Sequence, residues 1–389
     1  MHHNGRMGFQ SRAPVRMPLV FSLVSTLESL MLSLTSSFRW LTALLIVAHG
    51  ALAPASAHAQ SDDAPRVYVC NQGEATVSIL DAERLAVVDT VDLQALGFSE
   101  NAKPHHAVAE PDGSFWYLSM IGENTVLKFN RENEMVDRFD FEVPGMLTLH
   151  PTRNLLLVGR SMSAVNPPKS IAMVNRGDMT AESLDTFFPR PHATTAEMQG
   201  GYAYTASLAN NQMMAVNLET QDTELHRLGG TTQTLVQFAS TPTGETLIAG
   251  GQMTGQLLIF DTRNAPEVTV VDTLEVGTQP WHPVISADSR TAYLPNKASH
   301  SISVIDLPSR TITATITGEG LSEPHGSALV GRYLFVTNNN RKGRYTPSGE
   351  NPDAGTVTVI DTHHNEIVEV IEVGTYPTGI GTWGGQRTP

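Results

Sequence analysis

The sequence repeats itself seven times, and this repetition most limits how the chain can fold. Three units are clear from their first run of residues, which reads VYVCN from Val67, AYLPN from Ala292 and YLFVTN from Tyr333. Four fainter units begin near Phe115, Leu155, Tyr202 and Thr246. A repeat of about 40 to 50 residues is typical of propellers and related repeat architectures. The fold is therefore expected to consist of seven equivalent units.

Each unit contains three β-rich runs separated by turn residues, and the second run ends in Asp or Asn. A fourth short segment then follows a proline or its equivalent: Pro104, Pro144, Pro191, Leu235, Pro280, Pro324 and Pro377. Four strands in each of seven units describe an all-β, seven-bladed β-propeller with four-stranded blades.

The order of the strands predicts how the ring closes. The repeats begin with three strands and end with a lone fourth, Thr378–Trp383. We expect this last strand to complete the first blade, so that the N- and C-terminal strands pair and no open sheet edges remain. Residues 60–389 then form one propeller domain.

Residues 1–59 read as a leader segment rather than as part of the propeller. An arginine precedes an apolar run at 41–48, and Ala-His-Ala follows at 57–59, which is the pattern of a secretory signal. The run is too short to span a bilayer. The stretch before it is longer than an ordinary leader, so translation from Met17 or Met31 and an uncleaved anchor stay open. The expected location is periplasmic or secreted.

The net charge of −14 excludes two classes of partner. The leader holds four arginines against one glutamate, so its removal makes the rest more acidic still. Such a chain repels nucleic acid and anionic lipid, and neither nucleic acid nor a membrane is an expected partner after leader cleavage. The single cysteine, Cys70, excludes a disulfide framework and is expected to be a buried, inert thiol. No nucleophile elbow, phosphate-binding glycine loop or haem-attachment motif follows the leader.

Histidines gather at one position of the repeat. The segment after the repeat proline is expected to be the innermost strand, which lines the central channel. In four of the seven units, histidine occupies the first or second residue after this proline, or both. The five histidines are His105, His106, His192, His282 and His325. Only ten histidines follow the leader, so half of them share this position. Because equivalent points on the blades form a ring, we expect these five imidazoles to meet at one mouth of the channel.

Neutral imidazole is a common ligand of zinc, copper and iron, so this set predicts a metal site. A single histidine at such a turn more often bonds to neighbouring backbone. The other five histidines, on outer strands or turns, are expected to be solvated or to lie far from this mouth: His150, His226, His300, His363 and His364.

Two known families share these features. The strands VYVCN, AYLPN and LFVTN resemble the YVTN-type propeller repeat, across most of residues 66–385. The histidine segments HHAVAEPDGSFWYL, PHATTAEMQGGYAYT, QPWH and PHGS resemble, in the same order, the propeller domain of nitrous oxide reductase. That resemblance implies a copper site built from histidines of the innermost strands.

The departures from the reductase limit what the resemblance implies. Its copper–sulfide cluster uses seven histidines, whereas five match here, with Met146 and Thr378 at the other two positions. The reductase also has a cupredoxin domain with a dinuclear copper centre, which the sequence to Pro389 lacks and which Cys70 alone could not supply. Reduction of nitrous oxide is therefore not expected.

The sequence thus predicts a metal site made by the five histidines with Met146, copper being favoured and zinc or a d1-type haem the alternatives. Its function would be redox chemistry on a small molecule, or copper binding without turnover. The alternative is a non-catalytic YVTN-type scaffold that binds protein or cell-envelope ligands on a propeller face.

Two further features lie beside the repeats. The insertion Asn338–Gly355 brings three bases and a tyrosine to a loop that either covers a channel mouth and holds an anion or is simply solvated. Glu110, Glu197 and Glu323 lie near the histidine segments, where they either orient an imidazole or belong to surface turns.

Overall fold

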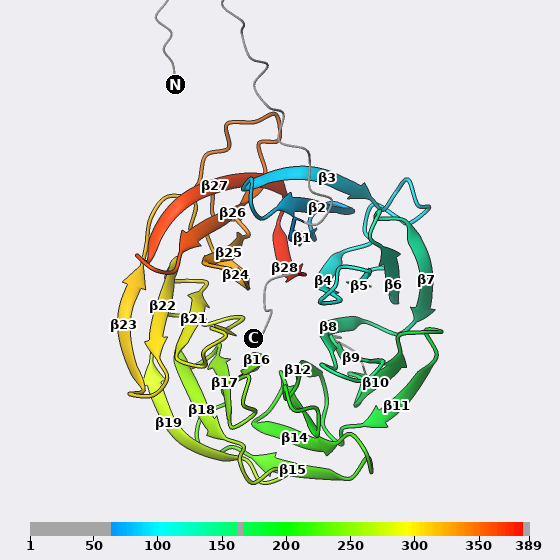
Figure 1. Ribbon diagram of the computed structural model, residues 1–389, viewed down its shortest axis with the longest axis vertical. Helices are drawn as coiled ribbons and strands as arrows, with labels where there is room; N and C mark the ends of the chain where they lie inside the picture. The colour runs from blue at the N-terminus through cyan, green and yellow to red at the C-terminus, as the bar shows by residue number, and fades with distance from the viewer. Residues whose placement is uncertain (1–63, 162–165, 384–389) are drawn as a thin grey trace, which may run out of the picture. The chain divides into compact units, whose positions relative to one another are not determined.

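The computed structural model describes residues 64–161 and 166–383, so the leader predicted for residues 1–59 lies outside the described residues. The described chain forms 28 β-strands in seven antiparallel sheets of four, arranged round an axis (Figure 1). The seven-bladed propeller is thereby confirmed. No helix in this part of the chain is long and apolar enough to cross a membrane.

The first four blades, each given from the axis outward, have the following strands. Blade 1 contains β28 (Pro377–Thr382), β1 (Arg66–Asn71), β2 (Thr76–Asp81) and β3 (Ala86–Asp92). Blade 2 contains β4 (Pro104–Ala109), β5 (Phe115–Met120), β6 (Thr125–Asn130) and β7 (Met135–Asp140). Blade 3 contains β8 (Pro144–Leu149), β9 (Leu155–Arg160), β10 (Ser170–Asn175) and β11 (Ala181–Asp185). Blade 4 contains β12 (Pro191–Ala196), β13 (Tyr202–Ser207), β14 (Gln212–Asn217) and β15 (Thr223–Arg227).

The last three blades follow the same plan. Blade 5 contains β16 (Leu235–Ser240), β17 (Thr246–Gly251), β18 (Gln256–Asp261) and β19 (Thr269–Glu275). Blade 6 contains β20 (Val284–Ile285), β21 (Thr291–Asn296), β22 (Ser301–Asp306) and β23 (Thr311–Ile316). Blade 7 contains β24 (Pro324–Val330), β25 (Tyr333–Asn338), β26 (Ala354–Asp361) and β27 (Glu366–Thr375).

The last strand closes the ring as expected. β28 pairs antiparallel with β1, with Val67 opposite Thr382 and Val69 opposite Ile380. One sheet therefore joins the two ends of the propeller, and the closure prediction is confirmed for its pairing.

The Asp or Asn that ends the third strand from the axis fixes the turn to the outer strand. Asp81 accepts hydrogen bonds from the backbone N–H groups of Glu83 and Arg84. The side-chain oxygen of the equivalent residue does the same in other blades: Asn217, Asp261, Asp306 and Asp361. Local bonding of this kind explains why the repeat keeps these two residue types there.

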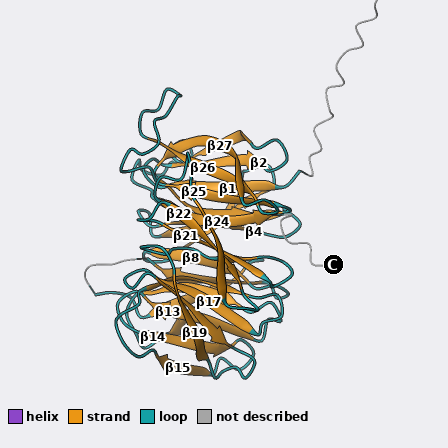
Figure 2. Cartoon of the chain, turned by 90° about the vertical axis from the view of Figure 1, so that its left-hand side faces the viewer, coloured by secondary structure: helices purple, strands orange, loops and turns teal. Residues whose placement is uncertain are grey.

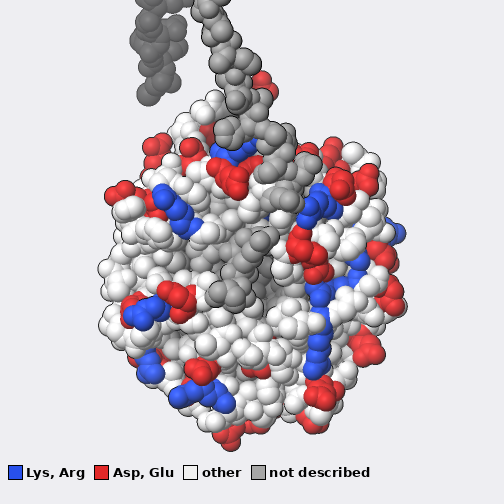
Figure 3. Space-filling view, in the orientation of Figure 1, with Lys and Arg blue, Asp and Glu red and all other residues white. Residues whose placement is uncertain are grey.

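The apolar core lies mainly between neighbouring blades. Between blades 1 and 2, for example, Trp116 is fully buried and stacks on Tyr68 and Phe129, with ring centroids 4.6 and 4.1 Å apart. The outer strands are largely exposed. On the face drawn in Figure 3, acidic and basic side chains are interspersed.

The starts of the inner strands lie at one face, where their histidine rings meet, and the last residues of several of them line one cavity at the other face. Figure 2 shows the ring edge-on, between these two faces. We call these the histidine end and the opposite end. Six inner strands begin at the repeat proline or Leu235, as predicted. Blade 6 differs, because Pro280 makes only an isolated bridge to Asn296 and β20 is two residues long. Pro283 directly follows His282, and a proline has no N–H to donate to a ladder.

Candidate functional site

A β-bulge lies where the inner strands carry their histidines. In blade 2 the pairing passes from Pro104–Met120 directly to His106–Ser119, which leaves His105 without an opposite residue. Pairing shifts in the same way after Pro191 in β12 and after Pro324 in β24. Since a bulge changes the direction of the side chains around it, neighbouring His105 and His106 can both join the cluster.

The imidazole rings from four blades meet at the histidine end. The ring centroids of His105 and His192 are 5.6 Å apart, those of His106 and His282 are 6.2 Å apart, and those of His282 and His325 are 4.8 Å apart. All five histidines are buried. The side chains that the sequence placed at one mouth of the channel thus lie in ring contact. Whether they bind a metal stays a prediction.

Hydrogen bonds fix the position of the proton on two of the rings. The Nδ1 of His192 lies 2.8 Å from the carbonyl oxygen of Val236, to which it donates. The Nδ1 of His105 lies 3.4 Å from Oε1 of Gln72 and donates in the same sense. A neutral imidazole has one N–H, so the Nε2 atoms of both rings retain their lone pairs.

His106 has the opposite arrangement. Its Nδ1 accepts a hydrogen bond of 3.2 Å from the backbone N–H of Leu147. In a neutral ring the proton therefore lies on Nε2, which makes His106 a hydrogen-bond donor toward the cluster. His106 is for this reason less suited to ligate a metal through Nε2 than His105 or His192.

Three nitrogens of the cluster are buried without a hydrogen-bond partner among the described residues: Nε2 of His105, Nε2 of His282 and Nδ1 of His325. A buried polar atom left unpaired destabilises the folded state by about 1 to 3 kcal/mol. Such groups are rare in folded proteins and call for a reason, such as a bound ion. All three lie within the cluster, which makes it the candidate site.

Burial keeps the five imidazoles neutral. Desolvation, followed by the charges of neighbouring imidazoles, lowers the pKa of His105, His282 and His325 well below its ordinary value. Desolvation likewise lowers the pKa of His106 to about 3 and that of His192 to about 4. At neutral pH the rings are therefore unprotonated, which is the form that binds metal ions.

An aromatic and basic wall adjoins the cluster. The ring of Trp281 lies 4.9 Å from that of His325, and Lys297 Nζ lies 4.7 Å from the centroid of Trp281 and 5.7 Å from that of Tyr376. Burial is the largest cause that lowers the pKa of Lys297 to about 8. One positive charge thus lies directly beside the imidazoles.

Sequence reasoning missed Lys297 and Gln72, although the repeat carries a signal for both. Each is the residue directly after the asparagine that ends the second strand from the axis, Asn296 in blade 6 and Asn71 in blade 1. This position adjoins the start of the inner strand, so aligning the repeats there as well would have identified both residues.

Other predicted residues have a structural role or no contact that links them to the cluster. Met146 is fully buried on β8, next to the Leu147 that bonds His106. His300 is buried and accepts the N–H of Glu323, so the expectation that it is solvated is wrong. Cys70 is buried, as expected, and burial raises its pKa.

The three glutamates considered as orienting groups have other partners. Glu110 pairs with Arg176, and a side-chain oxygen of Glu197 accepts the N–H of Gly201. Glu323 accepts the N–H of Lys342. Their bonds therefore support the turn interpretation.

The rings as they stand do not form a closed coordination sphere. Within residues 64–161 and 166–383, no three His, Cys, Asp or Glu side chains are grouped as around one metal ion. The imidazoles form a pair, His105 with His192, and a group of three. In that group His282 contacts His106 and His325. The unpartnered nitrogens belong to both groups. The donor set fits a nitrogen-binding metal, provided that side chains rotate to meet it.

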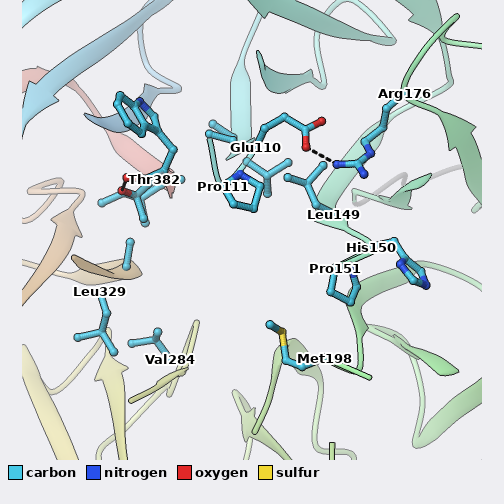
Figure 4. Close-up of a pocket in the computed structure, with 17 residues that line it drawn as sticks. Glu110, Pro111, Leu149, His150, Pro151, Arg176, Met198, Val284, Leu329 and Thr382 are labelled. Carbon is cyan, nitrogen blue, oxygen red and sulfur yellow. Dashed lines mark hydrogen bonds and ion pairs between the residues drawn. The ribbon is translucent and has the colours of Figure 1, made fainter. Parts of the chain in front are cut away.

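The opposite end of the axis has a different character (Figure 4). A cavity of about 410 Å³ there is lined by apolar side chains that include Leu149, Met198, Val284 and Leu329. Arg176 binds Glu110 here, and His150 Nε2 lies 2.9 Å from the carbonyl oxygen of Gly200. Arg176 Nε and Trp383 Nε1, by contrast, are buried without a hydrogen-bond partner among the described residues. This end therefore lacks the unpartnered imidazoles that mark the histidine end.

Comparison with known proteins supports the fold and assigns no family. No protein-family model and no curated protein matches the chain. Among solved structures, it is similar to a functionally unknown protein from Desulfotomaculum acetoxidans, with a TM-score of 0.65, 13% identity and coverage of 82% of this chain and 99% of that one.

Two named proteins are similar in the same way. Apo AztD from Citrobacter koseri has a TM-score of 0.56, 11% identity and coverage of 84% of this chain and 99% of that one. Kuenenia stuttgartiensis hydrazine synthase has a TM-score of 0.59, 15% identity and coverage of 72% and 89%. At sequence identities this low, the similarity supports the fold and says nothing about function. The resemblances to YVTN repeats and to nitrous oxide reductase stay predictions.

Proposed function

We propose that this protein is an exported propeller that binds copper through the histidines of its inner strands. The observation that carries this proposal is the cluster of buried, neutral imidazoles with three unpartnered ring nitrogens. A bound cation would accept those lone pairs and remove the cost of leaving them unpaired. His105, His192, His282 and His325 would hold the metal. His106 would orient a neighbouring group or donate a hydrogen bond from its Nε2 toward the cluster.

The arrangement of the rings in one group of two and one of three favours copper over zinc. Structural zinc is almost always four-coordinate, whereas Cu(I) is stable with two or three nitrogen ligands. Among divalent ions, Cu(II) also binds nitrogen donors more tightly than zinc does. Met146 would add a soft thioether for Cu(I) if it turned toward the cluster. Copper bound in this way would serve either storage or redox chemistry on a small molecule.

Competition titration of the metal-free protein with Cu(I), Cu(II) and Zn(II) tests the proposal. We expect copper to be taken up in preference to zinc, and His192→Ala with His325→Ala to abolish uptake. The matched control is His363→Ala with His364→Ala, which removes two exposed imidazoles from an outer turn. Thermal melts of both variants establish that they are folded.

The outcomes separate the competing interpretations. If zinc binds more tightly than copper and the cluster variant abolishes that binding, the proposed metal is zinc. A visible haem spectrum in native protein would favour a d1-type haem. Copper uptake that is the same in the cluster variant would leave the scaffold interpretation, in which a propeller face binds protein or cell-envelope ligands.

A further inference from the structure

A second cavity lies beside the histidine end, between the insertion of blade 7 and the start of blade 1. It has a volume of about 720 Å³, and its lining includes Gln72, Lys103, Asn339, Asn340, Arg341 and Tyr376. Pockets that bind small molecules measure about 300 to 1,000 Å³. The cavity is therefore large enough for an organic ligand.

The insertion forms one wall of this cavity and is held in place at several points. Asn340 Nδ2 donates to the carbonyl oxygens of Tyr345 and Ala354, each at 3.0 Å. Glu372 accepts the hydroxyl of Tyr345 at 2.8 Å and the N–H of Gly349 at 2.9 Å. Beyond its first residues the loop extends outward past β27 rather than across the axis (Figure 1). Of the two alternatives for this insertion, its course therefore favours the solvated loop over a cover for the channel mouth.

Two cations line the cavity without a counter-ion. Neither Lys103 nor Arg341 has a carboxylate within salt-bridge distance in the described part of the chain, and both are exposed. The guanidinium of Arg341 lies 5.2 Å from the ring centroid of Tyr376. The lining includes one carboxylate, that of Asp353, which is also exposed.

A third base, Lys297, lies close to a residue that lines the cavity. Lys297 lies near the same Tyr376 ring as Arg341, with its Nζ 5.7 Å from the centroid. Desolvation and, to a smaller extent, the charges of Arg341 and Lys342 lower the pKa of Lys297, whereas the charge of Glu323 raises it. These bases therefore lie within electrostatic reach of one another and of one carboxylate. This gathering of bases on a chain of net charge −14 runs against its overall composition, and Arg341 and Lys103 within it have no ion-pair partner in the described part of the chain. A bound anion would relieve their repulsion.

We propose that this cavity binds a small organic dianion of the dicarboxylate class, with Arg341 and Lys103 each holding one carboxylate. A guanidinium can take a carboxylate through two parallel hydrogen bonds, and an ammonium supplies a point charge for the second. Gln72 lines the cavity and its Oε1 lies 3.4 Å from His105 Nδ1, so the dianion would bind next to the imidazole cluster. The inference does not depend on whether the histidines hold a metal.

Isothermal titration of the metal-free protein with succinate at low ionic strength tests the inference. We expect saturable 1:1 binding, and Arg341→Gln with Lys103→Gln should weaken it by about tenfold or more, since each change removes a charge-assisted hydrogen bond. Succinamate, which has the same length but one carboxylate fewer, should bind correspondingly more weakly to the unaltered protein.

The control variant removes the same charge elsewhere. Arg84 and Arg138 are exposed on outer parts of blades 1 and 2, so Arg84→Gln with Arg138→Gln should leave succinate binding within about twofold. Absence of succinate binding up to about 10 mM, or equal binding by the Arg341/Lys103 variant, would overturn the inference. If the control variant binds succinate equally weakly, the binding reflects the net charge of the protein rather than this cavity, and the inference is overturned. None of these results bears on copper uptake, which is measured separately.

Discussion

The same seven inner strands form both ends of the propeller axis, yet the two ends differ in which of their polar side chains lack partners. At the opposite end Glu110 pairs with Arg176 beside an apolar cavity, and the unpartnered polar atoms of its lining, among the described residues, are Arg176 Nε and Trp383 Nε1 rather than imidazole nitrogens. At the histidine end, three imidazole nitrogens are buried without a partner in the described chain, and the half-buried Lys297 lies beside them. Because unpaired buried groups oppose folding, the cluster of unpartnered imidazole nitrogens supports the proposal that the histidine end is the binding end.

The start of the inner strands carries a strained turn in every blade, although positive φ values also occur at the opposite end, as at Leu85, Asn133 and Arg310. The residue directly before the repeat proline or Leu235 has a positive φ, between 43° and 61°, in every blade: Lys103, Val143, Arg190, Thr234, Gln279, Glu323 and Tyr376. Residues other than glycine rarely adopt this conformation, and strain of this kind is concentrated at functional sites. The bulged, strained turn thus recurs at the end where the histidines gather.

The largest loss of stability is expected from removing the strand that closes the ring. Deletion of residues 376–389 removes β28, which pairs with β1, and leaves two open sheet edges. We expect loss of soluble monomer, measured by size-exclusion chromatography and thermal melting. A truncated protein that melts cooperatively near the temperature of the full chain would contradict this closure.

The opposite end should be sensitive in stability alone. Trp383 is buried in the core between blades 1 and 2 and lies 5.1 Å beneath the guanidinium of Arg131. Trp383→Ala should lower the free energy of unfolding by about 3 to 5 kcal/mol, the usual cost of truncating a buried aromatic. Copper and succinate binding by the folded variant should be unchanged. A loss of copper uptake at temperatures where the variant is folded would show that the two ends are coupled.

The histidine end should respond in the opposite way. Leucine is close to histidine in volume and has no nitrogen to leave unpaired, so His105→Leu with His325→Leu should leave the unfolding free energy unchanged or raise it. The same variant should lose copper uptake. Denaturant unfolding of the metal-free proteins measures the first effect, and a marked loss of stability would show that these imidazoles are structural.

Acid titration sharpens this comparison. Burial lowers the pKa of each cluster histidine from 6.5, to about 4 for His192, so below pH 6.5 the unfolded chain binds more protons than the folded one. Stability of the metal-free protein is therefore present above pH 6.5 and is lost as the pH falls from there toward 4. Because the double leucine variant has two fewer such groups, its melting temperature should depend less steeply on pH in this window.

The sequence predicted the fold closely because the repeat is encoded locally. The strands β5, β9, β13, β17 and β25 begin at the residues named from the pattern, and the turns after Asp81 and its equivalents follow from one side chain bonding its own backbone. Aligning the repeats also brought the five histidines to one position. These features depend on residue type and spacing, which a sequence displays directly.

The parts that the sequence did not predict depend on contacts between blades. The tautomer of His106 is set by the N–H of Leu147 on the neighbouring blade, and the bulge at His105 is a property of pairing register. The role of Lys297 depends on Trp281 and on Tyr376, which lies far away in the chain. Such properties follow only when separate segments are brought together, so no local pattern reports them.

The smallest expected effect concerns the strained turns. Val143 has a φ of 43° and Thr234 a φ of 55°, and a β-branched side chain is especially unfavourable in the left-handed region. Asparagine tolerates this region, so Val143→Asn and Thr234→Asn should each raise the unfolding free energy by about 1 kcal/mol. Lys103 has a similar φ of 51° but no branch at Cβ, so Lys103→Asn should gain less.

Denaturant unfolding of the three variants measures the series, and the ranking is more informative than any single value. If the strain belongs to the turn itself, both β-branched positions gain more than Lys103 does, although neither blade 3 nor blade 5 contributes a histidine. If the asparagine variants of Val143 and Thr234 are instead destabilised, the left-handed turn is held by packing of those side chains. The positive φ would then be a feature of propeller architecture in general, and the contrast between the two ends would rest on the imidazoles alone.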